Sequence, residues 1–445
     1  MAYRAPELFD VKTGVTLDEK VDMWQYVTAS PGRTALLGVI YTPIIIFVLN
    51  ILKQLVVPQD PSLPPEVFHW IPFIGSFIAY SDDPLNFLFE CREKYGDVFT
   101  FTLLGRKVTI ALGVKGNNFV LGGKSTAFSA EDAYTHLTSP IFGKDVVYNV
   151  PNEVFMEQKK FVKVGLSTEN FWARTLQGKE VRSGLDKSFS ALSNDLDGGF
   201  TPLNLIPLRD HEIAHIMIAL LMAGQHTSSA SSSWTLLHLA QNVEVQEALY
   251  QEQVDHFGNL DGSFRPMTYE GFRKLPVLDP AIHETLRMHP PILSTMRYVR
   301  SDVPVPSTLA APSKDSVYVV PKGHYVLASA AVSQWDPTRW SDPQGVAAQA
   351  FKTYSDENGE KIDYGFGAVS KGTESPYQPF GAGRHRCIGE QFAYLQLGTV
   401  ISNITHKVEL RLEDGITEIP EHNYHTMITM PKKPRNVCYR RRRFD

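Results

Sequence analysis

The eleven residues PFGAGRHRCIG, at positions 379–389, place one cysteine in a glycine-rich loop that leads into a helical pattern. After Cys387, the apolar residues Ile388, Phe392 and Leu395 recur at the spacing of one helix face. The cysteine therefore lies at a predicted helix N-terminus, where free N–H groups and the helix dipole stabilise a thiolate. The loop glycines let the backbone approach the sulfur without an intervening Cβ. Each residue alone also fits a glycine-rich turn beside a buried cysteine, but the full order favours a metal-binding thiolate.

A haem iron fits this loop, because haem needs one fixed axial ligand and a thiolate donates the electron density that favours O–O cleavage. We therefore predict Cys387 as the axial ligand of haem b. Phe380 is expected to cover the proximal face of the porphyrin. His385, with Arg384 or Arg386, is expected to offer positive charge to the haem propionates.

A second motif, Glu284-Thr-Leu-Arg287, lies in a helical pattern upstream of the loop. Residues three apart share a helix face, so this carboxylate and guanidinium can form a charge-assisted hydrogen-bonded pair. Alone the motif is weak, because any solvated helix can contain such a pair. Its position ahead of the cysteine loop strengthens the haem prediction.

A third motif, AGQHTS at 223–228, lies within a long helical pattern from Pro207 to Phe257. Gly224 weakens the helix and the Thr227 hydroxyl can bond back to a carbonyl, so we expect a local distortion. Such a groove leaves room for O2 above the iron, and Thr227 and His226 are predicted to relay protons there. A His-Thr pair on a helix is more often structural, but the other two motifs favour the catalytic interpretation.

Together the three motifs resemble the cytochrome P450 superfamily. The loop at 379–389 is similar to the family's haem-binding loop, Phe-x-x-Gly-x-Arg/His-x-Cys-x-Gly, with His385 at the basic position. In the family an arginine further on joins the Glu-x-x-Arg pair, and Arg339 in WDPTRW matches it. The resemblance also implies O2 as co-substrate and electrons from NADPH, delivered by a partner reductase.

EDAYTHLTSPIFGKDVVYNVPN and MEQKKFVKVGLSTENF, together with His226, resemble the fungal sterol 14α-demethylases. The resemblance implies that five residues contact haem or its propionates: Tyr134, Tyr148, Lys159, Arg297 and His385. It also implies a mostly apolar sterol cavity, as suits a rigid apolar substrate. Its lining residues would be Leu137, Thr138, Phe142, Phe200, Pro202, Met222, Ala223, Ser294, Met296 and Met427. Azole inhibitors would bind the iron in such an enzyme.

Composition indicates one large globular unit. The chain has 445 residues, 43% of them hydrophobic, and no linker divides it. A net charge of −5 gives no support for binding nucleic acid. The cysteines Cys91, Cys387 and Cys438 form no spaced pairs, which argues against a disulfide framework or a thiolate zinc cluster and for a reducing compartment.

The uncharged stretch Ala35 to Leu52, between Arg33 and Lys53, is a predicted transmembrane helix. Spanning a bilayer core takes about 20 residues, and this stretch nearly suffices. A buried core helix is the alternative, which Pro43 slightly favours. We predict a single-pass protein of the endoplasmic reticulum membrane, with its catalytic part in the cytosol. The expected divisions are a lumenal or amphipathic segment (1–34), the membrane helix (35–52), a semi-rigid proline-rich linker (53–72) and the haem domain (73–445).

The predicted fold is mainly α with small β-sheets, the cytochrome P450 fold. Two hairpins are expected, one in VFTFTLLGRKVTIAL (98–112) around Gly105 and one in YVVPKGHYVLA (318–328) at Lys322-Gly323. A GGKS sequence at 122–125 lacks the upstream glycine of a phosphate-binding loop, and the Asn403 glycosylation sequon lies in a predicted cytosolic helix. Both are expected to be structural. The basic C-terminal tail could contact anionic lipid or an acidic reductase, although such tails are usually solvated.

The chain departs from the resembled family around residues 171–210, where several helices of the distal cover have no counterpart. A further shortening precedes WDPTRW, and Leu293 replaces a histidine usual near the sterol pocket. The predicted function is removal of the 14α-methyl group of lanosterol or eburicol in ergosterol biosynthesis. Two alternatives remain: another microsomal lipid monooxygenase, or a truncated non-catalytic paralogue.

Overall fold

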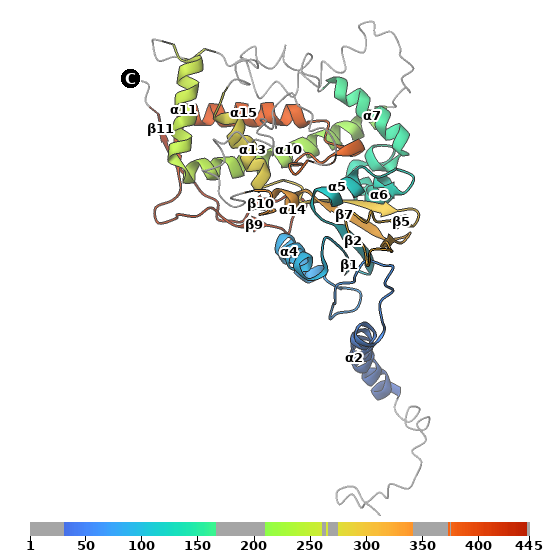
Figure 1. The fold of residues 1–445 in the computed structure, drawn as a ribbon. Coiled ribbons are helices and arrows are strands. Elements are labelled where there is room, and N and C mark those ends of the chain that lie inside the picture. Colours follow the sequence, from blue (N-terminus) through green and yellow to red (C-terminus); the bar gives the residue numbers. More distant parts are fainter. Residues whose placement is uncertain are drawn as a thin grey trace, which may run out of the picture.

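The computed structural model describes residues 31–165, 210–259, 264–265, 275–340, 373 and 375–442. Its helices are α2 (Pro31–Val56), α3 (Phe77–Asp82), α4 (Pro84–Tyr95), α5 (Gly113–Leu121), α6 (Ala130–Phe142), α7 (Asn152–Gly165), α10 (Asp210–Gln241), α11 (Val243–Phe257), α13 (Leu278–Met288), α14 (Ala330–Gln334) and α15 (Glu390–Lys407). Its strands are β1 (Val98–Leu103), β2 (Arg106–Ala111), β3 (Phe128–Ser129), β4 (Ser294–Val299), β5 (Val303–Pro304), β6 (Val319–Val320), β7 (Tyr325–Ser329), β8 (Val408–Arg411), β9 (His422–Asn423), β10 (Met430–Pro431) and β11 (Cys438–Arg441). Helices predominate over small sheets, as the sequence predicts (Figure 1).

The largest sheet has the strand order β1-β2-β7-β4-β3. The predicted hairpin at 98–112 is confirmed, because β1 and β2 pair antiparallel with Val98 opposite Ala111. Its turn residues, Leu104 and Gly105, have φ values of 49° and 75°. Positive φ at both central residues gives a turn whose twist matches that of the strands.

The second predicted hairpin is wrong in its pairing. The chain does turn at Gly323, where φ is 90°, but β6 pairs with β5 and not with β7. Strand β7 instead lies between β2, its parallel neighbour, and β4, its antiparallel neighbour. Both edges of β7 are therefore occupied by strands distant in sequence, which local patterning cannot reveal.

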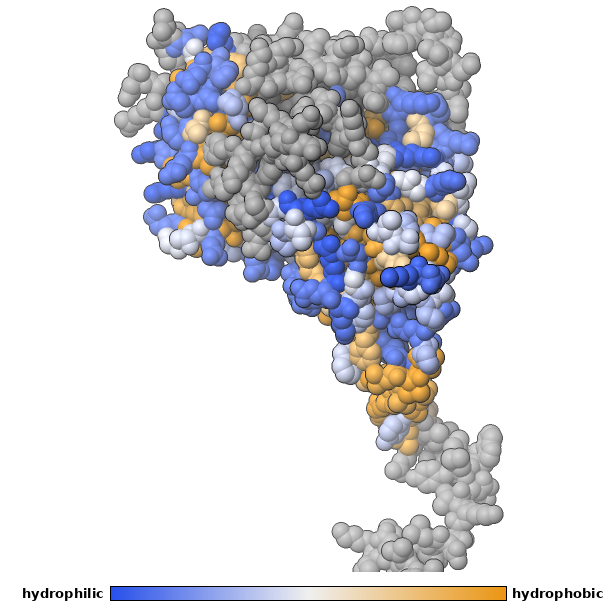
Figure 2. Space-filling model, viewed as in Figure 1, coloured by the Kyte–Doolittle hydropathy of each residue, from blue (hydrophilic) through white to orange (hydrophobic). Residues whose placement is uncertain are grey.

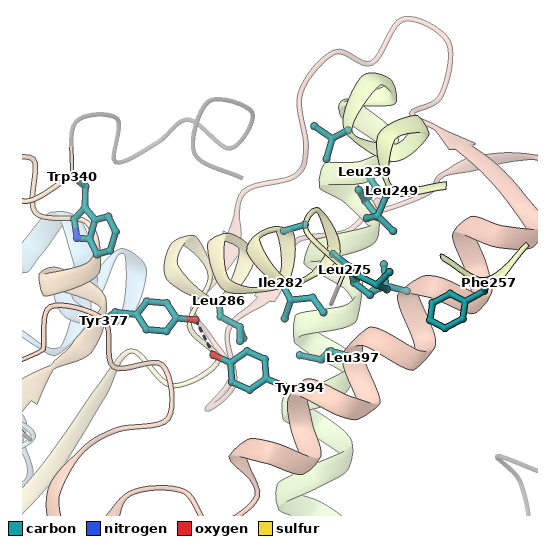
Figure 3. Close-up of a cluster of buried hydrophobic side chains, with 14 residues drawn as sticks. Leu239, Leu249, Phe257, Leu275, Ile282, Leu286, Trp340, Tyr377, Tyr394 and Leu397 are labelled. Carbon is teal, nitrogen blue, oxygen red and sulfur yellow. Dashed lines mark hydrogen bonds between the residues drawn. The ribbon is translucent and has the colours of Figure 1, made fainter. Parts of the chain in front are cut away.

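A helical layer lies beside the sheet, and α10 contacts α11, α13 and α15 within it (Figure 1). The predicted helical run from Pro207 to Phe257 consists, in its described part, of α10 and α11, which meet at Asn242. On α13, Leu278, Ile282 and Leu286 recur every fourth residue, and all three are buried. They face a cluster of buried side chains from α10, α11 and α15 that forms the main core (Figure 3).

Helix α2 extends away from this body and forms the apolar surface at the lower end of the molecule (Figures 1 and 2). It begins before and ends after the predicted 35–52 span, and Ala35–Val56 is apolar and long enough to cross a membrane. The following proline-rich segment is extended but also tied to the domain. The Gln54 side chain exchanges hydrogen bonds of 2.8 and 3.0 Å with the backbone of His69. The Val67 N–H donates to the Thr100 carbonyl at 2.7 Å, at the edge of the sheet.

Three histidines form a chain of contacts within the helical layer. His238 Nε2 lies 2.7 Å from His289 Nε2, and His289 Nδ1 lies 2.6 Å from His422 Nε2. Trp234 stacks on His289 with its ring centroid 3.8 Å away. Burial lowers the pKa of His238 and of His422 to about 4 and lowers that of His289 well below its ordinary value. The three rings are therefore neutral in the folded protein at neutral pH.

We expect this chain to make folding sensitive to acid. The pKa of an unfolded histidine is about 6.5, so below that pH the unfolded chain binds more protons and stability falls as the pH drops towards 4. At pH 5, His238 and His422 should each cost roughly 2 kcal/mol of the free energy of unfolding relative to pH 8. Replacing His422 by Asn should therefore flatten the fall of the thermal midpoint between pH 8 and pH 5. The exposed His425→Asn should not, and equal pH dependence in all three proteins would contradict the assignment.

Candidate functional site

The loop before α15 is fixed by backbone contacts. The Cys387 N–H donates to the Phe380 carbonyl at 3.0 Å, which closes the loop on itself. Gly383 has a φ of 67°, and a Cβ there would lie 2.3 Å from the Leu121 carbonyl oxygen. This position therefore requires glycine both for its backbone conformation and for the close approach to α5.

Cys387 lies just ahead of α15, as predicted, with Gly389 as the helix N-cap. The cysteine is exposed, and a Cβ at Gly389 would be 3.8 Å from its sulfur. Desolvation by the surrounding protein raises the pKa of the Cys387 thiol, opposed by the Gly389 N–H and by the charges of Lys159 and Arg386. A bound cation would shift this balance towards the thiolate. The sulfur is thus accessible to a metal, while the protein alone favours the protonated thiol.

Aromatic rings gather beside this loop. Tyr134 stacks on Tyr148 with centroids 5.1 Å apart, and Tyr148 lies 6.0 Å from His385. Phe155 of α7 stacks on His385 itself, with ring centroids 5.8 Å apart. Phe155 was not predicted as a site residue. The sequence could have indicated it, because Phe155 stands four residues before Lys159 and so shares its helix face. In the structure the Lys159 ammonium lies 5.7 Å from the centre of the Phe155 ring.

Lys159 and His385 connect the rings to the loop. The Lys159 ammonium donates to the carbonyls of Arg384 and Arg386 at 3.2 and 3.1 Å. Burial, helped by the charges of Arg297 and Lys159, lowers the pKa of His385 to about 3. His385 is therefore neutral in this structure, and its predicted contact with the haem propionates stays a prediction. Its Nδ1 is buried and has no hydrogen-bond partner among the described residues.

Arg297 provides the clearest test of whether the site fits haem. Its side chain on β4 is buried, and its one hydrogen bond runs to the adjacent Met296 carbonyl at 2.8 Å. Within the described part of the chain, no carboxylate pairs with it. A buried guanidinium without an anion is costly. The residues present therefore fit a ligand that brings negative groups, as the two propionates of haem do.

Arg386, a predicted propionate ligand, has a carboxylate partner in this structure. It forms a two-bond ion pair with Glu390, at 2.7 and 2.6 Å. The first turn of α15 supplies this carboxylate four residues after the arginine, so the positive charge is already balanced. Phe380 packs against Tyr394, with ring centroids 5.2 Å apart, at the edge of the main core.

The predicted proton-relay residues lie in the middle of α10. The Thr227 hydroxyl donates to the Ala223 carbonyl at 2.6 Å, as expected, and His226 is exposed. The predicted local distortion is absent, because α10 is an uninterrupted α-helix. A Cβ at Gly224 would meet no atom within 4 Å, so no neighbour displaces the backbone at the glycine.

The predicted sterol residues lie on three elements and one connection. Leu137, Thr138 and Phe142 are on α6, Met222 and Ala223 on α10, Ser294 and Met296 on β4, and Met427 between β9 and β10. The structure joins α6 to β4, because the Met296 N–H donates to the Tyr134 hydroxyl at 2.8 Å. Phe142 and Ile388, the neighbour of Cys387, both pack against the small buried cluster that contains Ile216 of α10. Met427 is 81% exposed and is not brought to this group, and Phe200 and Pro202 lie outside the described residues.

The Glu284–Arg287 pair is confirmed. Arg287 Nε and Nη2 donate to the Glu284 carboxylate at 2.8 and 2.6 Å, and both residues are buried. Arg339 is predicted to be the third partner of this pair. That prediction is wrong in this structure, because the Arg339 side chain is exposed and makes no described bond to Glu284. The N–H groups of Arg339 and Trp340 both donate to the Asp336 carbonyl. This tight turn places the Trp340 ring, 5.0 Å away, over the Arg287 guanidinium instead.

Comparison with known proteins is consistent with this site. The cytochrome P450 family pattern matches residues 64–178 and 204–439. The chain is 42% identical to a lanosterol 14-alpha demethylase of Mycosarcoma maydis, with 96% of both proteins covered. It is 38% identical to an eburicol 14-alpha-demethylase of Penicillium italicum, covering 88% of this chain and 94% of that protein. The structure of retinoic acid bound cyanobacterial CYP120A1 shares the fold, with a TM-score of 0.64 at 18% identity over 86% of this chain and 100% of that one.

The same comparison bears on the predicted shortening. The Mycosarcoma maydis alignment runs over 544 residues, which exceeds the 445 residues of this chain, so the relative has stretches that this chain lacks. The family match is also interrupted between residues 178 and 204, inside the segment predicted to be shortened.

We expect Arg297→Ala to weaken haem retention. Removing the buried cation should lose its charge-assisted bond to an anionic ligand, at a cost of roughly 1.5–3 kcal/mol, or tenfold or more in affinity. Arg300→Ala is the matched control, because Arg300 lies just beyond the same strand but is exposed and paired with Asp132. Haem content per chain after dilution and gel filtration measures the effect. Equal retention by both variants would show that Arg297 does not hold the ligand.

Proposed function

Since the chain belongs to the cytochrome P450 family, we propose that it is a haem-thiolate monooxygenase that removes the 14α-methyl group of a lanosterol- or eburicol-like sterol. The observation that supports this substrate most is the identity of about 40% to sterol demethylases over nearly their whole length. The chain's own chemistry agrees, since the accessible Cys387 precedes a helix, and the charge of the buried Arg297, which pairs with no described carboxylate, acts on His385 of the same loop.

In this proposal, haem b activates O2 when bound, using NADPH electrons delivered by a reductase. The residues of the chain hold and orient that group. Cys387 supplies the axial thiolate, and Arg297 and Lys159 balance the propionate charges. The tyrosine pair Tyr134 and Tyr148 offers hydroxyl groups, and burial raises the pKa of Tyr148 to about 12, so it stays a hydrogen-bond donor.

Proton delivery is assigned to Thr227 and His226. The Thr227 hydroxyl proton is held by the Ala223 carbonyl at 2.6 Å, which leaves the hydroxyl oxygen able to accept a hydrogen bond from a neighbour. His226 is exposed and next in sequence, so it can exchange protons with solvent. No described hydrogen bond joins the two side chains, so the proposed relay needs the Thr227 hydroxyl to turn from the Ala223 carbonyl.

Attachment to the endoplasmic reticulum membrane, with a cytosolic catalytic domain, is a further part of the proposal. The apolar helix at Ala35–Val56 is long enough to cross a bilayer and is not covered by the rest of the described chain. Its C-terminal end is bonded to the linker through Gln54 and His69, and the linker is bonded to the domain through Val67 and Thr100, so the span would also set the orientation of the domain. Loss of alkali-resistant membrane attachment on removing residues 1–57 is the measurement that supports this anchor. Azole compounds are expected as inhibitors.

A truncated non-catalytic paralogue is the second candidate. The observation that favours it is the length of the relative's alignment, which exceeds the length of this chain. The two candidates differ in turnover. Reconstituted with a reductase and NADPH, an active demethylase releases formate from lanosterol, whereas a non-catalytic paralogue releases none.

We expect Thr227→Ala to reduce demethylated product per NADPH consumed by about tenfold or more, because proton delivery by a positioned group contributes at least that much. Sterol affinity, followed by the Soret shift, should change little. Ser233→Ala is the matched control, since the Ser233 hydroxyl also donates to a carbonyl one turn earlier on α10, at 2.8 Å. Equal losses of sterol binding and turnover, without added peroxide release, would assign Thr227 to packing instead.

A further inference from the structure

The loop after α6 and the first turn of α10 bring together three side chains that ligate metals. Asp145 of the loop and His211 and Glu212 of α10 each present one donor atom, and these atoms all lie within 4.8 Å of one another. None of the three has a role in the proposed haem and sterol chemistry. We propose that they bind one divalent cation of the zinc class.

The spacing of one donor pair fits such an ion. His211 Nε2 and Asp145 Oδ2 are 3.4 Å apart, longer than the roughly 2.7–2.9 Å of a strong charge-assisted hydrogen bond. Two ligands on a tetrahedral zinc ion, each about 2.0–2.2 Å from the metal, lie roughly 3.3–3.5 Å from each other. The pair is thus set at the separation that a shared ion requires.

The backbone of Asp145 is held without help from a metal. Asp145 has a φ of 67°, a conformation that a non-glycine residue rarely adopts. Two contacts hold it there: its N–H donates to Asn149 Oδ1 at 2.9 Å, and the Gln158 amide donates to its carbonyl at 2.9 Å. The loop is therefore prepared before an ion arrives.

His215 fixes the same loop from the next turn of α10. Its Nδ1 lies 3.1 Å from the Lys144 carbonyl, which can only accept, so Nδ1 carries the proton and Nε2 keeps its lone pair. The ring lies against Gly143, where a Cβ would be 2.5 Å from His215 Cε1. His211 and His215 stand four residues apart with Glu212 between them, a spacing found in helical zinc sites. The His215 ring lies 5.8 Å from the His211 ring, so it supports the loop beside the three donor atoms.

The donor set selects the class of ion. Imidazole nitrogen with carboxylate oxygen suits zinc, nickel or cobalt, whereas calcium and magnesium prefer oxygen ligands alone. A bound ion would join α10 to the loop that leads through Val147 to Tyr148, one of the predicted haem contacts. The proposed ion would thus have a structural role: it would hold this loop in place and take no part in the oxygenase chemistry itself.

Zinc binding to the detergent-solubilised, haem-loaded full chain tests the proposal. Calorimetry with Zn²⁺ alone should show one ion per chain, and zinc X-ray absorption should show nitrogen and oxygen ligands near about 2.0 Å. His211→Ala and Asp145→Asn should each weaken binding by about tenfold or more, since even indirect supports of metal sites contribute that much. His425→Ala, which removes another exposed histidine, should leave the affinity unchanged.

Two results would overturn the site. Unchanged zinc affinity in both His211→Ala and Asp145→Asn would reduce the cluster to an ion pair between histidine and carboxylate. A zinc–sulfur distance near about 2.3 Å would place the ion on a cysteine instead. Because the two variants alter different elements, misfolding of one still leaves the other to decide.

Discussion

The hydrogen bond from the Cys387 N–H to the Phe380 carbonyl, at 3.0 Å, closes the loop that presents the sulfur ahead of α15. The remaining parts of the site are arranged around this closed loop. Gly383 brings the loop against α5, the Lys159 ammonium binds two of its carbonyls, and Phe380 packs against Tyr394 of the core. A displaced loop would lose contacts to α5, α7 and α15 together, so the position of the sulfur is coupled to the packing of the whole helical layer.

Charge imposes a second constraint. Arg297 is buried on β4 without a described carboxylate, while Arg386 is balanced by Glu390 and Arg287 by Glu284. Among the described residues, the arginines that support the loop and the core are thus neutralised by carboxylates, whereas Arg297 stays available for an anionic ligand. His385 stays neutral beside it, which limits the positive charge that must be held together when no anion is present. In a purely structural network we would expect every buried arginine to have a carboxylate partner, and Arg297 has none among the described residues.

Much of this could be predicted where the signal is local in sequence. The hairpin at 98–112 follows from its turn, and the Glu284–Arg287 pair follows from helical spacing. The gathering of Tyr134, Tyr148, Lys159 and His385 also agrees with the family resemblance. The failures depend on contacts distant in sequence. The edges of β7 are occupied by β2 and β4, and a tight turn at Asp336 buries Trp340 in place of Arg339. The histidine chain joins α10, the end of α13 and β9, which no local pattern could reveal.

The central claim is that Cys387 is the axial thiolate of a bound haem. The carbon monoxide difference spectrum of the reduced, purified protein tests it most directly, because the position of the Soret band reports the ligand opposite carbon monoxide. The account predicts the red-shifted band of thiolate ligation in the natural chain and its loss in Cys387→Ser, with Cys91→Ser and Cys438→Ser unchanged. A thiolate band that survives in Cys387→Ser, or its absence from the haem-loaded natural chain, would contradict the account.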